Sequence, residues 1–141
     1  MTTTTAAPAE AHSHRETAIR AGLAVLGASS LLTALLMVVD PSGFLDEVGG
    51  FGAANDHLVR DVSTWVAAYG AALLLAVRLV SWRVPVLALG VAQGVLHAVN
   101  HVADAGIASP SWKGAVNVAV LGGITLVTAW LLVAARREER A

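Results

Sequence analysis

Residues 83–104 read RVPVLALGVAQGVLHAVNHVAD, and this stretch decides how the rest of the chain is interpreted. Most of its side chains are apolar, which suits the interior of a bilayer. It also carries polar side chains that we call the polar stripe, namely Gln93, His97, Asn100, His101 and Asp104. Because unpaired polar groups are costly in hydrocarbon, one side of this stretch needs partners.

The polar stripe lies on one face of the helix that this stretch predicts. Each residue of an α-helix turns about 100° around the axis. With His97 taken as zero, the rest of the stripe and two glycines, Gly90 and Gly94, fall within about 60° of it. The opposite face predicts contact with lipid and carries Leu87, Val91, Leu96 and Val99. We therefore predict that the stripe turns toward other helices.

Gly90 and Gly94 have the spacing of a GxxxG pattern, in which small residues let a second helix approach closely. The pattern alone is weak because the chain contains 13 glycines. Its position on the face of the polar stripe strengthens the prediction of helix packing there. Asn117, in the fourth apolar segment, is a further polar residue to which we assign a packing role.

The composition indicates a membrane protein. Only 13% of the 141 residues are charged, about half the fraction of a soluble domain, and the mean hydropathy is +0.68. The chain has no cysteine, which excludes disulfides, thiolate ligands, iron–sulfur clusters and thiol catalysis. A net charge of −1 without a basic run indicates no nucleic-acid partner.

Four apolar segments are long enough to cross a bilayer, at residues 18–39, 62–80, 84–103 and 115–135. They predict an all-α fold, an integral membrane four-helix bundle, in a single domain at residues 18–136. Residues 1–17 are rich in Thr and Ala and predict a disordered tail, and residues 137–141 form a second tail. Residues 41–60 combine glycines with acidic and apolar residues and predict a short helix on the membrane surface.

Basic residues indicate the orientation. They concentrate at the two terminal flanks and between the second and third segments, as Arg15, Arg20, Arg78, Arg83, Arg136, Arg137 and Arg140. Cytoplasmic flanks carry the excess of Lys and Arg. We therefore predict that both termini are cytoplasmic and that the two acidic loops face outward.

This topology places the start of the second helix and the end of the third at the outer side. We expect an antiparallel hairpin there to bring His57 and Asp61 close to His97, His101 and Asp104. A position near a helix N-terminus also explains Asp61 without any site. Asp104 lies at a helix C-terminus, where a carboxylate is unfavourable, and therefore predicts a partner: Arg60, Lys113 or a protonated histidine.

The histidines have three interpretations that the sequence leaves open: structural hydrogen bonding, metal binding, and proton or redox chemistry. Metal binding would use His57, Asp61, His97, His101 and Asp104 as nitrogen and oxygen ligands, which suit zinc or iron. Haem fits less well because His97 and His101 are neighbours on one helix rather than opposed. No hydrolase signature or phosphate-binding loop is present, which favours a non-enzymatic role.

Two phrases, HLVRDVSTW at 57–65 and LHAVNHVAD at 96–104, are similar to those of uncharacterised actinobacterial proteins of the DoxX-like group. That group comprises small four-span bacterial membrane proteins, and the resemblance covers the four spans. It implies the same fold and a location in the bacterial plasma membrane. Thiol redox chemistry, which some members are linked to, does not carry over because this chain has no cysteine.

Three functions follow from these observations. The first is a multi-pass accessory or interaction protein that, besides the lipid bilayer, contacts a membrane protein partner or further copies of itself. The second is a metal-binding or redox-linked membrane protein that uses the His/Asp cluster. The third is a pathway for protons or small solutes, which would require an oligomer because one four-helix chain offers little room.

Overall fold

The structure is a computed structural model, and it describes residues 7–49 and 55–140. Five α-helices follow one another: α1 (Ala7–Val39), α2 (Pro41–Phe44), α3 (Asp56–Arg78), α4 (Val80–Asp104) and α5 (Trp112–Glu138). A π-helical segment, η1 (Leu45–Gly49), follows α2, and a 3-10 turn, η2 (Ala105–Ile107), follows α4. Within these described ranges there is no β-strand. The predicted all-α class is therefore confirmed.

Four helical stretches are long and apolar enough to cross a membrane: Ser13–Val39, Asp56–Arg78, Val80–Ile107 and Trp112–Glu138. Each contains or overlaps one of the four predicted segments. Helices are expected in this setting because every backbone N–H and C=O must find a partner within the segment. The chain therefore has the composition and secondary structure of a multi-pass membrane protein.

Helix α1 begins at Ala7 and thus includes much of the stretch that we expected to be disordered. Residues 1–6 lie outside the described part of the chain. The difference has a physical cause, because Arg15 and Glu16 both form ion pairs with distant helices, as described below. At the other end α5 continues to Glu138, so the predicted C-terminal tail starts within a helix.

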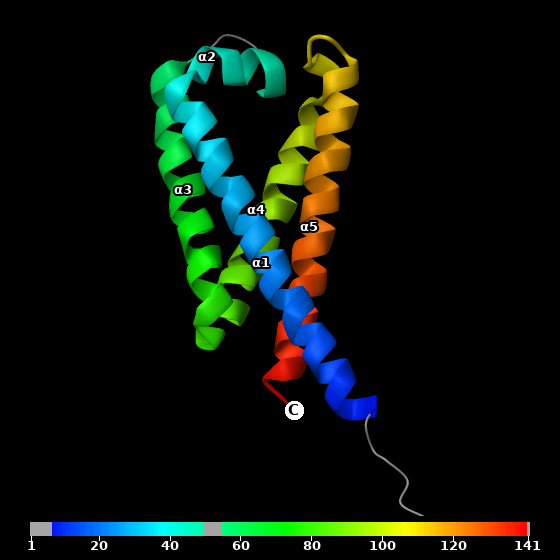
Figure 1. Ribbon diagram of the computed structural model, residues 1–141. Coiled ribbons are helices and arrows are strands. Elements are labelled where there is room, and N and C mark those ends of the chain that lie inside the picture. Colours follow the sequence, from blue (N-terminus) through cyan, green and yellow to red (C-terminus); the bar gives the residue numbers. More distant parts are fainter. Residues whose placement is uncertain (1–6, 50–54, 141) are drawn as a thin grey trace, which may run out of the picture.

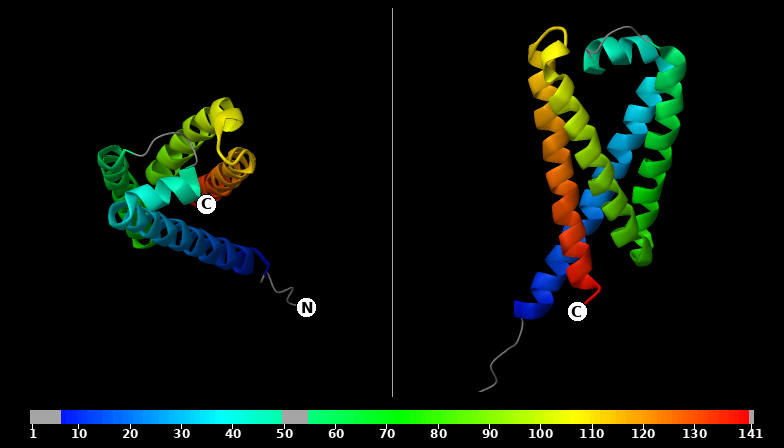
Figure 2. Two further views of the ribbon diagram at one scale, coloured as in Figure 1. Left: turned by 90° about the horizontal axis from the view of Figure 1, so that it is seen from above. Right: turned by 180° about the vertical axis from the view of Figure 1, so that it is seen from behind.

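The long helices are arranged as two pairs, α1 with α3 and α4 with α5. Figure 1 shows the pairs crossing at one end and diverging toward the other, and Figure 2 shows the same divergence from behind. We call the crossing end, which holds the α3–α4 turn and the end of α5, the closed end. We call the opposite end, which holds α2, η1 and η2, the open end.

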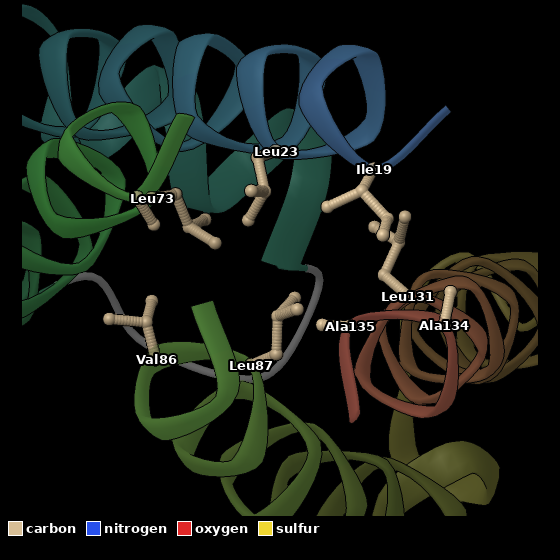
Figure 3. Packing of buried hydrophobic residues seen from close by; sticks show 9 residues of the cluster. Ile19, Leu23, Leu73, Val86, Leu87, Leu131, Ala134 and Ala135 are labelled. Atoms are coloured by element: carbon tan, nitrogen blue, oxygen red, sulfur yellow. The ribbon is translucent and has the colours of Figure 1, made fainter. Parts of the chain in front are cut away.

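The apolar core lies toward the closed end, where all four long helices contribute to it. Leu23 of α1, Leu73 of α3, Leu87 of α4 and Leu131 of α5 are each fully buried, and Figure 3 shows these side chains converging. The prediction that Leu87 faces lipid is therefore wrong. Leu87 lies on the closed-end part of α4, where the helix is covered by its neighbours, whereas Leu96 is 69% exposed.

Helices α1 and α3 are in close backbone contact at a pair of glycines, Gly27 and Gly70. A Cβ atom on either residue would lie 3.0 Å from the carbonyl oxygen of the other. Small residues allow such backbone contact between helices in a membrane. This pair therefore allows α1 and α3 to pack closely against each other.

A buried arginine joins three elements at the closed end. Arg83 is 3% exposed, and its Nη1 and Nη2 atoms lie 2.6 and 2.9 Å from the two carboxylate oxygens of Glu16. The same guanidinium donates to the carbonyl oxygens of Ala76 and Val77, at 3.2 and 3.3 Å. These carbonyls belong to the last turn of α3, which has no helical donors for them. Arg83 thus links α4 to both α1 and α3.

Candidate functional site

The polar stripe is on the same side of α4 as the glycines that pack against other helices. His97 follows Gly90 by two helical turns, and His101 follows Gly94 by two turns. A Cβ atom on Gly90 would collide with the Tyr69 hydroxyl of α3, and one on Gly94 would collide with the Thr125 hydroxyl of α5. Both glycines therefore occupy a packed part of this face.

Toward the open end the same face is uncovered. Gln93, His97, Asn100 and Asp104 are exposed, and His101 is partly buried. The change follows from the arrangement of the helices, because the α1–α3 pair moves away from the α4–α5 pair in this direction (Figure 1). The stripe lies on the side of Gly90 and Gly94, but the predicted cover by other helices is not observed for His97, Asn100 and Asp104, which are exposed.

Within the stripe, polar atoms contact one another along α4. The side-chain amide nitrogen of Gln93 lies 3.2 Å from Nδ1 of His97. The Nε2 atoms of His97 and His101 are 3.0 Å apart, and the two rings are tilted by 35° with their centroids 4.8 Å apart. One turn separates each residue from the next, so Gln93, His97 and His101 form a continuous polar chain.

His57 and Asp61 form a separate pair at the first turns of α3. Their Nε2 and Oδ2 atoms are 3.4 Å apart, and the side chains are 88% and 63% exposed. In residues 7–49 and 55–140, no group of three or more His, Asp, Glu or Cys side chains is close enough to share a metal ion. The expected convergence of the second and third helices at this end is thus absent, since α3 follows α1 and α4 follows α5.

Asp104 lies at the exposed end of α4 and has neither of its two predicted basic partners. Nη2 of Arg60 instead lies 3.9 Å from Oδ2 of Asp56, which is one turn away on α3. Lys113 is almost fully buried and donates to the backbone oxygen of Asp46. The described side chains therefore leave Asp104 facing the surroundings of the bundle.

Asn117 holds the segment that lies across the open end. Its amide nitrogen donates to the carbonyl oxygens of Val48 and Gly49 in η1, at 2.9 and 3.3 Å. Together with the Lys113 contact, this joins η1 to the start of α5. Figure 2, seen from above, shows α2 and η1 extending from one helix pair toward the other. Asn117 thus anchors this short helical segment rather than packing against a long helix.

Asp40 and Asp56 hold the other end of the segment. The Asp40 carboxylate accepts from the backbone N–H of Gly43 at 3.0 Å and so caps α2, as a residue at the N-cap position does. The Ser42 hydroxyl donates to Asp56 at 2.8 Å. The short helix predicted within residues 41–60 is thus present as α2 and η1.

A cavity of about 80 Å³ lies among α1, α3, α4 and α5. Its polar lining consists of Ser30, Tyr69, Gln93, Thr125 and Thr128. Ser30, Thr125 and Thr128 donate to the carbonyl oxygens of their own helices, at 2.9, 2.7 and 2.8 Å. Such back-bonding satisfies hydroxyl donors inside a membrane bundle. Gln93 also lines a shallow outer groove with Leu89, Ala92, Leu96, His97 and Asn100.

These positions define the class of molecule as a multi-pass helical membrane protein with an uncovered polar face on one helix. Comparison of the chain with protein-family models, with curated proteins and with solved structures found no match. The resemblance to the DoxX-like group therefore stays a prediction.

Proposed function

We propose that this chain is an integral membrane interaction protein that associates with a second copy of itself through the exposed side of α4. The contact surface is the outer groove formed by Leu89, Ala92, Gln93, Leu96, His97 and Asn100. Both termini lie on the cytoplasmic side of a bacterial plasma membrane in this proposal, in agreement with the placement of basic residues.

The observation that carries the proposal is the exposure of polar side chains within a membrane-spanning helix. Gln93, His97 and Asn100 are exposed although they lie inside the stretch Val80–Ile107. His97 is about 10 Å from the end of α4 along the helix axis, a depth at which hydrocarbon solvates imidazole and amide groups poorly. Covering this face with a second helix replaces lipid by hydrogen-bonding partners.

The face is suited to a copy of itself. Between Leu89 and Asn100 it carries no charged residue, and its polar groups are amides and imidazoles. An amide, like a neutral imidazole, both donates and accepts, so each group can pair with its own counterpart. Two chains inserted in the same orientation are related by a two-fold axis along the membrane normal, which places identical residues at equal depth. A partner of another sequence would have to carry complementary polar residues at the same depths in the membrane.

The structure offers less support for a proton or solute pathway. The cavity among the four helices is followed toward the closed end by the buried side chains Leu23, Leu73, Leu87 and Leu131. Beyond these the Arg83–Glu16 pair joins α4 to α1. A continuous path would require these contacts to separate.

Cross-linking tests the proposal directly, because the chain has no cysteine of its own. Ala92→Cys places one thiol in the outer groove. Ala68→Cys places one on an exposed site of α3 at a matching distance from the open end. In oxidised lipid vesicles at high lipid excess, Ala92→Cys is expected to give a disulfide dimer and Ala68→Cys a monomer. Absence of the Ala92→Cys dimer, or equal cross-linking at both sites, contradicts the proposal.

A further inference from the structure

We infer that the closed end of α4 binds an anionic phospholipid, with Arg78 holding the phosphate and one acyl chain lying in an adjoining groove. This groove, which we call the closed-end groove, has a volume of about 460 Å³ and is lined by Ser81, Trp82, Pro85, Val86 and Leu89. It continues the outer groove toward the closed end, and the two grooves share Leu89. The inference does not depend on the association of two chains.

The closed-end groove runs along α4 from the α3–α4 turn into the apolar part of the helix. Ser81 and Leu89 are eight residues apart, which corresponds to about 12 Å along the axis. One leaflet contributes about half of a hydrocarbon core of about 30 Å, so the groove covers most of that depth. Ser81 and Pro85 are exposed, and Trp82 and Leu89 are 44% and 47% exposed. The length, direction and mainly apolar lining of the groove therefore fit a hydrocarbon chain.

Arg78 lies at the end of the groove that is nearest the membrane surface. It is the last residue of α3, and only Leu79 separates it from α4. The three residues from Arg78 to Ser81 span at most about 11 Å, so the guanidinium is within reach of a phosphate beside the Ser81 hydroxyl. The side chain is exposed, and the described residues place no carboxylate in an ion pair with it.

Arg83, the other arginine that flanks the turn, differs from Arg78 in each of these respects. It is buried, and its guanidinium is occupied by Glu16 and by two carbonyl oxygens of α3. Arg83 therefore joins helices, whereas the donors of Arg78 are available to an external anion. Guanidinium donors match the geometry of phosphate oxygens, and an arginine keeps its charge at any physiological pH.

The charge of the whole closed end favours an anionic headgroup over a zwitterionic one. Seven of the nine Lys and Arg residues lie toward this end of the bundle, against four of the ten Asp and Glu residues. The open end carries the remaining two basic and six acidic residues. Clustered arginines at a membrane surface attract anionic lipids. Charge complementarity thus selects a phospholipid with a net negative charge, of which phosphatidylglycerol is the representative.

Trp82 supplies a contact at the boundary between headgroups and hydrocarbon. It lies in the first turn of α4, next to Ser81. An indole combines a large apolar ring with one N–H donor, and tryptophan is enriched at this depth of a membrane for that reason. An acyl chain in the groove packs against the ring, and the N–H is available to an ester oxygen of the lipid.

Native mass spectrometry of the full chain in detergent, with added phosphatidylglycerol or phosphatidylcholine, tests the inference. One phosphatidylglycerol per chain is expected to bind about tenfold more tightly than phosphatidylcholine, because several arginines attract the anion. Arg78→Gln is expected to weaken phosphatidylglycerol binding about fivefold and to leave phosphatidylcholine binding unchanged. Trp82→Ala is expected to weaken the binding of both lipids, since the ring contacts the chain and not the charge.

Arg136→Gln and Trp130→Ala are the matched controls. They remove the same groups from exposed positions of α5, a helix that does not line the groove, and are expected to change lipid affinity much less. Equal losses with Arg78→Gln and Arg136→Gln would assign the preference to the charge of the whole end and overturn the site. Equal affinity of the unmodified chain for both lipids, or displacement of phosphatidylglycerol by glycerol 3-phosphate alone, would also overturn it. Monomers and dimers are resolved in the same spectrum, so lipid binding by the monomer tests this site whatever the outcome for association.

Discussion

At the closed end, leucine side chains and a buried arginine join all four long helices, whereas at the open end the helix pairs are separated and spanned by a short segment. Closed-end contacts connect different helices, such as Arg83 with Glu16 across 67 positions of the chain. The polar stripe instead makes contacts along α4, between Gln93 and His97 and between His97 and His101. Contacts between the long helices thus concentrate at the closed end, whereas these contacts of the polar stripe run along a single helix.

This comparison predicts that the largest loss of stability follows from removing the buried arginine. Arg83→Ala leaves the Glu16 carboxylate and two carbonyls of α3 without their donor, and breaking such a pair costs about 3 kcal/mol. We choose the lower end of the usual range because the Glu16 side chain is still 32% exposed. Reversible unfolding in mixed micelles measures the change.

Arg78→Ala is the matched control, because Arg78 is an exposed arginine of the last turn of α3. Its loss is expected to cost less than about 1 kcal/mol. Equal destabilisation by the two substitutions would show that the Arg83 contacts do not hold the closed end together.

The second prediction concerns the crossing of α1 and α3. Gly27→Ala places a Cβ atom 3.0 Å from the Gly70 carbonyl oxygen, and backbone atoms cannot move aside as a flexible side chain can. We expect a loss of about 2 kcal/mol, as for other overpacked sites. Gly122→Ala, where the new Cβ meets no atom within 4 Å, is expected to leave stability unchanged or raise it. A loss of the same size at Gly122 would assign the effect to glycine itself rather than to the crossing.

The long helices and the crossing of α1 with α3 show what the sequence could and could not predict. The four long helices follow from apolar length, because a segment in lipid must satisfy its own backbone. Which helices pack together does not follow from apolar length, because in lipid an apolar surface does not favour one neighbouring helix over another. Gly27 and Gly70 were indistinguishable from the other glycines, and neighbouring segments were therefore expected to stay together along their length. That expectation placed His57 and Asp61 beside His97 and His101, where the structure does not place them.

The same limit applies to Glu16. It precedes the first apolar segment in a stretch of mixed composition, and nothing nearby indicates a partner. Its ion pair exists because the short α3–α4 turn, with Leu79 as the only residue between the helices, places Arg83 beside the start of α1. The shared face of the polar stripe, in contrast, could be predicted because helical periodicity is a local property. Its exposure could not, because that depends on how the helix pairs diverge.

A third prediction addresses the uncovered face. Ala92→Trp fills the outer groove with a large ring, and we expect the dimer to weaken at least tenfold, or about 1.4 kcal/mol. Ala68→Trp on α3 provides the control with the same change in volume. Single-molecule counting of labelled chains in vesicles at increasing lipid dilution measures both. A dimer that resists Ala92→Trp but not Ala68→Trp would move the contact surface from α4 to α3.

The smallest effect is expected at the segment that lies across the open end. Asn117→Leu removes the donor to the carbonyl oxygens of Val48 and Gly49, and one such hydrogen bond contributes about 1 kcal/mol. Because Lys113 still donates to Asp46, the segment should loosen without detaching. Hydrogen exchange of the amides at 45–49 should accelerate about fivefold, while the amides of the buried closed-end helices keep their rates. Val116→Ala, an exposed neighbour on α5, should alter neither. If exchange rose equally at both ends of the bundle, Asn117 would be acting on global stability, and the two ends would not be the separate units that their contacts indicate.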